Sequence, residues 1–228
     1  MRQMYRKSVT SEVVYYEDVY VDIGSILSTI EELSCSAVSD WEPWYTGGSD
    51  GYQYGHVKYM DRLALRTEID SDAAKKSKWL MDTLRSGMEE AALDYAKLFG
   101  IHEVFVRFAV KALHHERSKI GISYYLPGRQ MGPHIDWNED NSDIDYTIVV
   151  YLNDDYEGGE LHFVEPELEG LTIKPKAGSI VIFPSFMPYR HESLEIKEGR
   201  KMLITHHWKG GPRAKRIRHL LSVLRGEK

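Results

Sequence analysis

The sequence has little cysteine, no long apolar run and no excess of positive charge. Its single cysteine, Cys35, cannot form a disulfide within the chain, which fits a reducing compartment. No segment approaches the ~18 consecutive apolar residues of a membrane-spanning helix. The basic start, "MRQMYRKSVT", is not followed by an apolar stretch and is unlike a secretory signal. We therefore expect a cytoplasmic protein with no membrane partner.

The charge balance and the length limit the function and the domain count. A net charge of −6 argues against a general nucleic-acid binder, because such domains are strongly basic. The 228 residues fit one domain. We expect that domain to span 1–228. Within it, 1–100 would hold an N-terminal strand, helices and an aromatic loop, 101–210 a β core, and 211–228 a C-terminal helix.

The N-terminal part mixes helical and extended patterns. The Val- and Tyr-rich run at 12–24 predicts a strand, and the apolar spacing at 25–34 predicts a helix. The clearest helix is 70–100, which has Asp and Ser at its start and Gly100 at its end. Its apolar stripe is expected to pack on a sheet and consists of Leu80, Leu84, Met88, Ala91, Tyr95 and Leu98.

Short apolar runs dominate the chain after residue 103. Turn residues such as "PG", "NDD", "EGG" and "KAG" separate them, which is typical of an antiparallel sandwich or barrel. The predicted strands are "VFVRFAV", "IGISYYL", "YTIVVYLN", "GELHFVE", "LTIKP", "SIVIFP" and "MLITHHW". We expect a mainly β (α+β) fold with supporting N-terminal helices. The segment 212–228 predicts a terminal amphipathic helix. Its basic face could contact nucleic acid or an acidic partner, but we favour a helix that packs and exposes this face to water.

The segment 39–56 is rich in Gly, Ser and Asp and also in Trp and Tyr. Its punctuation predicts a loop. Aromatic loops on rigid scaffolds can grip extended peptides, so one interpretation is a lid over a peptide substrate. The other is a loop held on the core by its own aromatic residues.

Three residues suggest a metal site. His134 and Asp136 stand two apart in "GRQMGPHIDWNED" (128–140), so on a strand they share a face. His191 follows another predicted strand, and antiparallel strands can bring it beside them. Two histidines and one carboxylate form the facial triad of non-haem Fe(II) oxygenases. A bare H-x-D pattern also occurs in surface turns, so the surrounding residues must decide.

Those surroundings resemble a known family. "YLPGRQMGPHID" (125–136), "TIVVYLNDDYEGGELHF" (147–163) and "KPKAGSIVIFPSFMPYRHESLEIKEGRKMLITHHW" (174–208) are similar, in order, to motifs of prolyl 4-hydroxylases and related 2-oxoglutarate/Fe(II) oxygenases. The resemblance covers about 120–208. It implies a double-stranded β-helix (jelly roll) with helices outside, which agrees with the pattern of predicted strands and helices.

The resemblance also implies roles for individual residues. His134, Asp136 and His191 would ligate Fe(II), with 2-oxoglutarate and O₂ as co-substrates and ascorbate as a further candidate cofactor. The distal carboxylate of 2-oxoglutarate needs a cation. The prolyl 4-hydroxylase spacing, ten residues after the distal histidine, selects Lys201, which we favour; the spacing of oxygen-sensing hydroxylases selects Arg200.

Tyr125 and Thr147 would donate hydrogen bonds to 2-oxoglutarate if the resemblance holds. A core aromatic is the other interpretation of Tyr125, and Tyr124 replaces it if the turn register shifts. Trp137, Arg190 and Trp208 are candidate substrate contacts; Arg190 is equally well explained by pairing with a surface acid.

The implied activity is hydroxylation of a C–H bond, with peptidyl proline as the leading substrate and succinate and CO₂ as co-products. Alternatives are the same chemistry on another residue or a small molecule, and a cupin-like module that binds metal without turnover. The pair His206 and His207 supports the site or contacts substrate in one interpretation. In the other, which we favour, it is a polar pair on an edge strand.

Overall fold

The computed structural model describes residues 5–34, 39–45, 53–61, 72–101, 103, 119–137 and 145–208. The helices of this part are α1 (Ile23–Ser34), α3 (Asp72–Leu98) and the short 3-10 turn η1 (Pro166–Leu168). Its strands are β1 (Tyr5–Thr10), β2 (Val13–Glu17), β3 (Ser39–Tyr45), β4 (Gln53–Asp61), β5 (Lys119–Tyr125), β6 (Met131–His134), β7 (Tyr146–Tyr151), β8 (Glu157–Gly158), β9 (Leu161–Phe163), β10 (Thr172–Ile173), β11 (Ser179–Pro184), β12 (His191–Ser193), β13 (Ile196–Glu198) and β14 (Lys201–Trp208).

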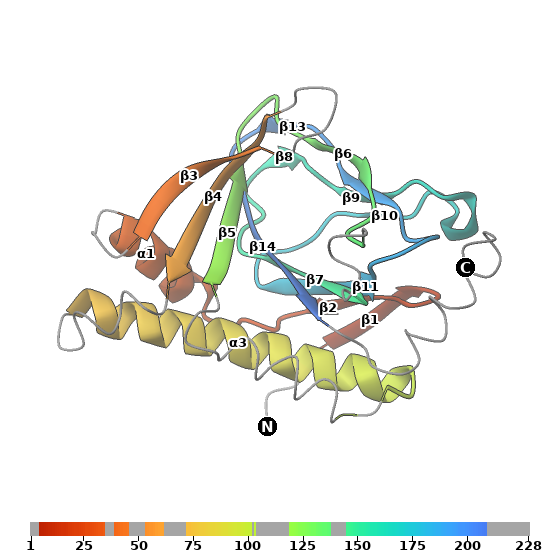
Figure 1. The fold of residues 1–228 in the computed structure, drawn as a ribbon, viewed down its shortest axis with the longest axis horizontal. Coiled ribbons are helices and arrows are strands. Elements are labelled where there is room, and N and C mark those ends of the chain that lie inside the picture. The colour runs from red at the N-terminus through yellow and green to blue at the C-terminus, as the bar shows by residue number, and fades with distance from the viewer. Residues whose placement is uncertain are drawn as a thin grey trace, which may run out of the picture.

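Most strands belong to one large antiparallel sheet, in the order β1-β2-β11-β7-β14-β5-β4-β3. A smaller sheet has the order β10-β9-β12-β6, and β8 pairs with β13. In Figure 1, α3 runs along one side of the large sheet while β6, β9 and β10 lie on the other side. The described part is therefore mainly β with its helices outside, as the strand pattern predicted.

Helix α3 covers the large sheet with the predicted stripe. The carboxylate of Asp72 in its first turn interacts favourably with the positive end of the helix dipole. Gly100, with φ +63°, follows its last turn. Leu98 departs from the prediction because it is 41% exposed; Phe99 packs against Tyr95 in its place, with ring centroids 4.6 Å apart. The fully buried stripe residues are Leu80, Leu84, Met88, Ala91 and Tyr95.

Alternation along the strands divides the core into two clusters. On β7, Ile148 and Val150 face the cluster beneath the helices, whereas Val149 and Tyr151 belong to the inner cluster between the sheets. This is the two-residue period of a strand with both faces covered. The inner cluster also contains Phe163 and residues of β11 and β14. The polar side chains of the site lie against this inner cluster.

Two predictions for the N-terminal part need correction. The strand predicted over 12–24 is only β2, because Asp18 adopts φ +56° and turns the chain toward α1. The segment predicted as a loop over 39–56 contains β3 and the start of β4, which pair antiparallel with Trp41 opposite Lys58. Aromatic and β-branched residues favour strands, which explains why this stretch pairs despite its polar residues.

Some predictions fall outside the described residues. These are the tip of the proposed lid (46–52), the strand at 104–110 and the terminal helix at 212–228. None of the described helices combines the length and the apolar character needed to cross a membrane. The division of 1–228 into three parts within one domain stays a prediction.

Candidate metal and co-substrate site

Two short strands of the smaller sheet bring the predicted ligands together. β12 pairs with β6 so that His191 lies opposite His134, and the centroids of the two imidazoles are 4.4 Å apart. β6 ends at His134, so Asp136 lies just beyond the strand rather than on it. The chain there is fixed by the Trp137 N–H, which donates to the Ser185 carbonyl at 2.9 Å.

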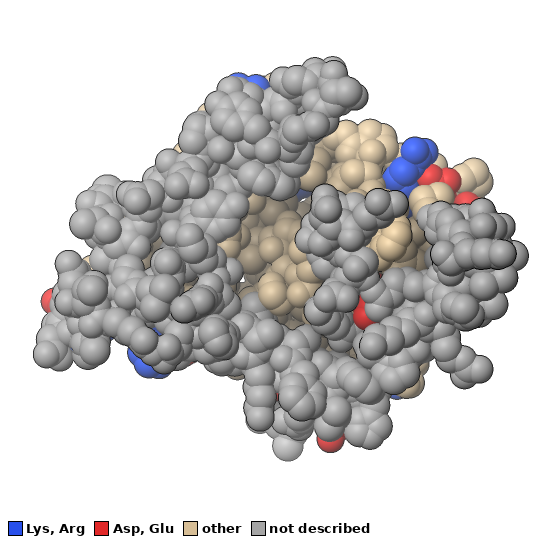
Figure 2. All heavy atoms as spheres, in the orientation of Figure 1, with Lys and Arg blue, Asp and Glu red and all other residues tan. Residues whose placement is uncertain are grey.

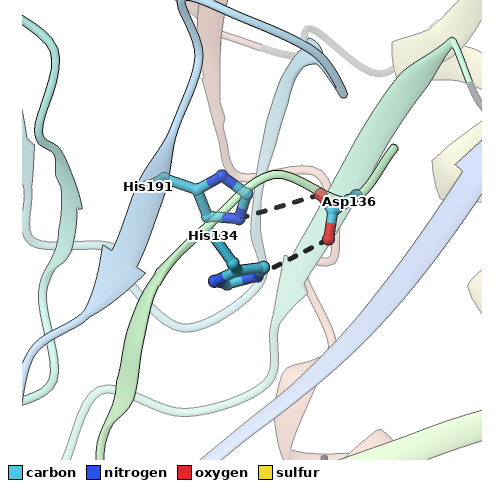
Figure 3. A group of neighbouring side chains, drawn as sticks. All are labelled: His134, Asp136 and His191. Atoms are coloured by element: carbon cyan, nitrogen blue, oxygen red, sulfur yellow. Dashed lines mark ion pairs between the residues drawn. The ribbon is translucent and has the colours of Figure 1, made fainter. Parts of the chain in front are cut away.

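The three side chains converge on one small volume. One potential ligand atom from each of His134, Asp136 and His191 lies within 4.8 Å of the other two. The Asp136 Oδ1 atom is 3.6 Å from His134 Nε2, and its Oδ2 atom is 3.7 Å from His191 Nε2. Figure 3 shows the carboxylate directed toward both rings. No other such group of histidine, cysteine and carboxylate side chains is found in the described part of the chain.

Backbone carbonyls orient both imidazoles. His134 Nδ1 is 2.8 Å from the Gly132 carbonyl oxygen, and His191 Nδ1 is 3.1 Å from that of Tyr189. Because a carbonyl can only accept, each Nδ1 carries a proton, and the neutral ring presents the lone pair of Nε2. Such support on the second nitrogen is the usual arrangement of histidines that ligate a metal. In its neutral form each ring therefore directs the Nε2 lone pair toward the same small volume.

Electrostatics keep the set ready for a cation. Burial raises the pKa of Asp136, but His191, His134 and His207 outweigh it and hold the pKa well below its usual range. Burial lowers the pKa of His191 to about 4, although Asp136 opposes this. For His134, burial is outweighed by the hydrogen bond and charge of Asp136, so its pKa is raised. Asp136 is thus an anion and His191 a neutral donor at neutral pH.

Thr147 is engaged by the carboxylate. It is fully buried on β7, and its hydroxyl donates to Asp136 Oδ2 at 2.5 Å. Sequence reasoning had given this hydroxyl to 2-oxoglutarate. In the structure its single proton is used within the protein, which makes Thr147 a support for the carboxylate.

Lys201 and Arg200 point in opposite directions. Lys201 is 1% exposed; its ammonium donates to the Gly159 carbonyl and, at 2.8 Å, to Ser193 Oγ. The Arg200 side chain is 47% exposed and lies 3.9 Å from Glu31 across the surface. No carboxylate forms an ion pair with Lys201 among the described residues. Lys201 is thus a buried basic group on the inner face of β14, whereas Arg200 lies at the surface.

Tyrosine rings surround this ammonium. Its Nζ lies 5.7 Å from the centroid of the Tyr125 ring and 5.4 Å from that of Tyr151. Tyr125 is 3% exposed, lies opposite Lys201 in the β5–β14 register, and directs its hydroxyl to Met131 Sδ at 3.7 Å. Tyr124, the alternative, instead lies under Arg200 on the other face, 5.6 Å from its guanidinium carbon.

The three predicted substrate contacts have different surroundings. Arg190 pairs with Glu165 at 2.7 Å, so pairing with a surface acid describes its present state. Trp137 is half-buried beside Asp136. Trp208 is 3% exposed and packs against Tyr95 and Tyr146 beneath the helices. Trp208 lies on the face of β14 that packs beneath the helices, away from the triad. The structure therefore argues against a substrate contact by Trp208.

Several polar groups that the sequence did not favour for the site lie near the triad. His207, expected on an edge strand, lies on β14 between β7 and β5 in the sheet order, and its Nδ1 atom is 3.3 Å from Thr147 Oγ1. The edge-strand interpretation is therefore wrong. Ser185 and Ser193 also enter the site, and the only sequence signal for Ser193 is its two-residue spacing from His191. Strand parity alone identifies such residues, once the inward face is known.

Gly158 occupies a position that only glycine fits, next to the carbonyl of Gly159 that receives Lys201. Its φ is +77°, and a Cβ there would lie 2.1 Å from the Glu195 carbonyl oxygen. We expect Gly158→Ala to lower the free energy of unfolding by about 2–4 kcal/mol through strain and overlap. Urea denaturation measures this. Gly24→Ala in α1 meets nothing within 4 Å and is the control, expected to be neutral or stabilising; equal losses in both variants would contradict the prediction.

A recess lies near the middle of the face seen in Figure 2, in the orientation of Figure 1. The part of its wall formed by described residues consists mainly of side chains other than Lys, Arg, Asp and Glu. In Figure 1 this central area lies between β14 of the large sheet and β9 of the smaller one.

Comparison with known proteins agrees with this geometry. Residues 120–209 match the family model described as "2OG-Fe(II) oxygenase superfamily". Human prolyl 3-hydroxylase 3 is 35% identical over 68 residues, 28% of this chain and 9% of that protein. A PKHD-type hydroxylase of Prochlorococcus marinus (strain NATL1A) is 35% identical over 79 residues, 33% of this chain and 34% of that protein.

One solved structure shares most of the fold. A prolyl hydroxylase from Trichoplax adhaerens, in complex with a hypoxia inducible factor oxygen degradation domain peptide fragment, aligns with a TM-score of 0.58 at 15% identity. The alignment covers 91% of this chain and 87% of that one. The predicted double-stranded β-helix is therefore confirmed.

Residues 120–209 are thus similar to the 2OG-Fe(II) oxygenase superfamily, and the described His-Asp-His set agrees with that similarity. Fe(II), 2-oxoglutarate and O₂ are the cofactor and co-substrates that this family implies. The donor set fits the ion, because two imidazoles and one carboxylate are the ligands of the facial triad. The chain spans only 9% and 34% of the two relatives' lengths, so their full activities do not transfer directly.

Proposed function

We propose that this protein hydroxylates a prolyl residue of a peptide or protein, and that it converts 2-oxoglutarate to succinate and CO₂ in the same cycle. The observation that carries the proposal is the pairing of the His134–Asp136–His191 set with a buried lysine that lacks a carboxylate partner among the described residues. A metal-binding module would need only the first of these. An enzyme that uses a dicarboxylate needs both.

His134, Asp136 and His191 would hold Fe(II), leaving positions open for the co-substrates. When bound, the metal with 2-oxoglutarate and O₂ supplies the oxidising power for C–H hydroxylation. The protein's own part is orientation. The carbonyls of Gly132 and Tyr189 hold the Nε2 lone pairs inward, and the ionised Asp136 offsets one positive charge of the metal.

Lys201 would receive the distal carboxylate of 2-oxoglutarate. Its contact Ser193 stands two residues after His191 on β12, which is about 6.6 Å along a strand. That distance is about the length of a five-carbon dicarboxylate that would bind the metal at one end and the ammonium at the other. Tyr125 and Tyr151 flank the ammonium and exclude water, which strengthens a charge-assisted hydrogen bond.

Peptidyl proline as the substrate is supported by the relatives. Human prolyl 3-hydroxylase 3 is 35% identical to this chain over 68 residues, and the Trichoplax prolyl hydroxylase of similar fold was solved with a peptide. Function does not follow from fold alone, so another residue or a small molecule is the second candidate.

Mass spectrometry tests the proposal. The protein is incubated with Fe(II), 2-oxoglutarate, O₂ and a library of proline-containing peptides, and products are examined for the gain of one oxygen on proline. Succinate is measured in parallel, with Asp136→Ala as the inactive control. Succinate without peptide oxidation would redirect the search to another substrate. Absence of succinate from the iron-loaded protein would defeat the proposed chemistry and favour a metal-binding module.

Binding of 2-oxoglutarate should weaken above neutral pH. Burial lowers the pKa of Lys201 to about 7, although the charge of Glu160 raises it. Above that pH the free protein carries a neutral amine, and carboxylate binding must take up a proton. We expect the Kd to rise by up to about tenfold per pH unit above 7 and to level off below.

Calorimetric titration of 2-oxoglutarate from pH 6 to 9, with Mn(II) in the site and under anaerobic conditions, measures this dependence. Lys201→Arg is the control, because a guanidinium stays charged over the whole range. A wild-type Kd as flat with pH as that of the arginine variant would show that Lys201 does not titrate near neutrality.

A further inference from the structure

The Thr147 hydroxyl is the centre of a buried polar cluster behind the metal ligands. Its Oγ1 atom is 2.5 Å from Asp136 Oδ2, 2.8 Å from Ser185 Oγ and 3.3 Å from His207 Nδ1. Thr147 and Ser185 are at most 1% exposed. Three side chains from separate segments therefore meet at the buried hydroxyl of a fourth.

The number of available protons determines which groups of this cluster donate hydrogen bonds and which accept them. A threonine hydroxyl has one proton, and the ionised Asp136 can only accept, so that proton lies on the shortest contact. His207 Nδ1 and Ser185 Oγ must then donate to Thr147 Oγ1. Two donors thus converge on a hydroxyl that donates onward to the carboxylate, and each bond polarises the next.

The sheet register sets His207 in place. His207 lies directly opposite Thr147 in the β14–β7 pairing, and Phe183, two residues before Ser185, lies opposite Thr147 from β11. Along β14, Lys201 and Leu203 face inward, so His207 shares the face of Lys201. Its neighbour His206 faces the helix side, where burial, together with His207 and the charge of Arg85, lowers its pKa.

We propose that His207 is a positioning residue: with Ser185 it orients Thr147, whose hydroxyl holds Asp136 Oδ2 and leaves Oδ1 as the oxygen presented to the metal. The inference rests on the proposed function, in which Asp136 is a metal ligand. The Asp136 side chain is one-tenth exposed and follows the end of β6, so the strand does not fix its rotation. The hydroxyl supplies that constraint and keeps the carboxylate from turning both oxygens toward the ion.

Binding of Co(II) alone tests the inference without turnover. We expect Thr147→Val and His207→Leu to raise the Co(II) Kd by about 10- to 100-fold, as loss of groups that orient ligands does. The visible spectrum of bound Co(II) should also change, because the carboxylate is then free to bind through two oxygens. His207→Asn, whose amide N–H can replace Nδ1–H, and Thr147→Ser should restore both values. His206→Leu, on the opposite face, is the matched control and should leave them unchanged.

The outcomes separate this inference from the proposed function. His134→Ala serves as the reference for the metal site itself: if it binds Co(II) as wild type does, the ligand assignment fails. If His134→Ala loses binding while His207→Leu keeps the wild-type Kd and spectrum, only the role of His207 is overturned. Weakened binding in His207→Leu that His207→Asn does not restore would indicate lost packing and would also overturn it.

Discussion

Lys201→Met is expected to raise the Kd for 2-oxoglutarate by about 30-fold or more, whereas Arg200→Gln should change it by less than about twofold. Truncating one partner of a buried, hydrogen-bonded charge pair costs about 2–5 kcal/mol, and 1.4 kcal/mol is tenfold in Kd. Lys201 is buried among Gly159, Ser193 and two tyrosine rings, so water cannot replace its ammonium. Arg200 lies on the surface beside Glu31.

The two variants form a matched pair because the residues are adjacent on the chain and face opposite sides. Methionine fills a similar volume, and it removes the cost of burying a charge, so the apoprotein should unfold at the same or a higher temperature. Titration calorimetry with Mn(II) in the site gives the Kd, and thermal unfolding checks the fold. A steep loss of affinity in Arg200→Gln with none in Lys201→Met would show that the distal carboxylate of 2-oxoglutarate binds Arg200 instead.

Long periodic elements were the most predictable part of the fold. The α3 pattern extends over many turns, and β7 and β11 are continuous apolar runs, so single residues do not decide them. The hairpin of β3 and β4 was missed because its glycines and polar residues also suit a loop, and the pairing partner β5 lies far along the chain. The two- and three-residue strands β8 and β13 are too short to show any period.

The candidate ligands could be predicted as residues, but their supports could not. Family-like spacing selects His134, Asp136 and His191 without coordinates. The choice between Lys201 and Arg200 depends on which face of β14 is inward, and that follows from the Leu203–Tyr151 register with β7. The same parity turns His207 inward and Trp208 outward. Hydroxyl contacts such as that of Thr147 depend on rotamers, which spacing does not encode.

Asp136→Ala and His134→Ala are expected to abolish metal binding and turnover while the fold persists. Loss of a supporting group costs about 10- to 100-fold in metal affinity, and loss of a ligand must cost more than that upper value. Asp136→Ala also removes the only negative charge of the set and leaves two neutral or repelling imidazoles around a dication. The inner and outer apolar clusters do not include either residue, so far-UV circular dichroism should be unchanged.

The measurement is Fe(II) or Co(II) content after dialysis, together with succinate formed from 2-oxoglutarate. His162→Ala is the control, because this histidine lies on β9 and bonds to Thr172 rather than to the triad. Retention of full metal content and succinate formation by either ligand variant would show that the ion binds elsewhere. Loss in His162→Ala as well would mean that the sheet, not the ligand set, governs the activity. Only the pattern in which His134 and Asp136 are required and His162 is not fits three convergent ligands held by β6 and β12.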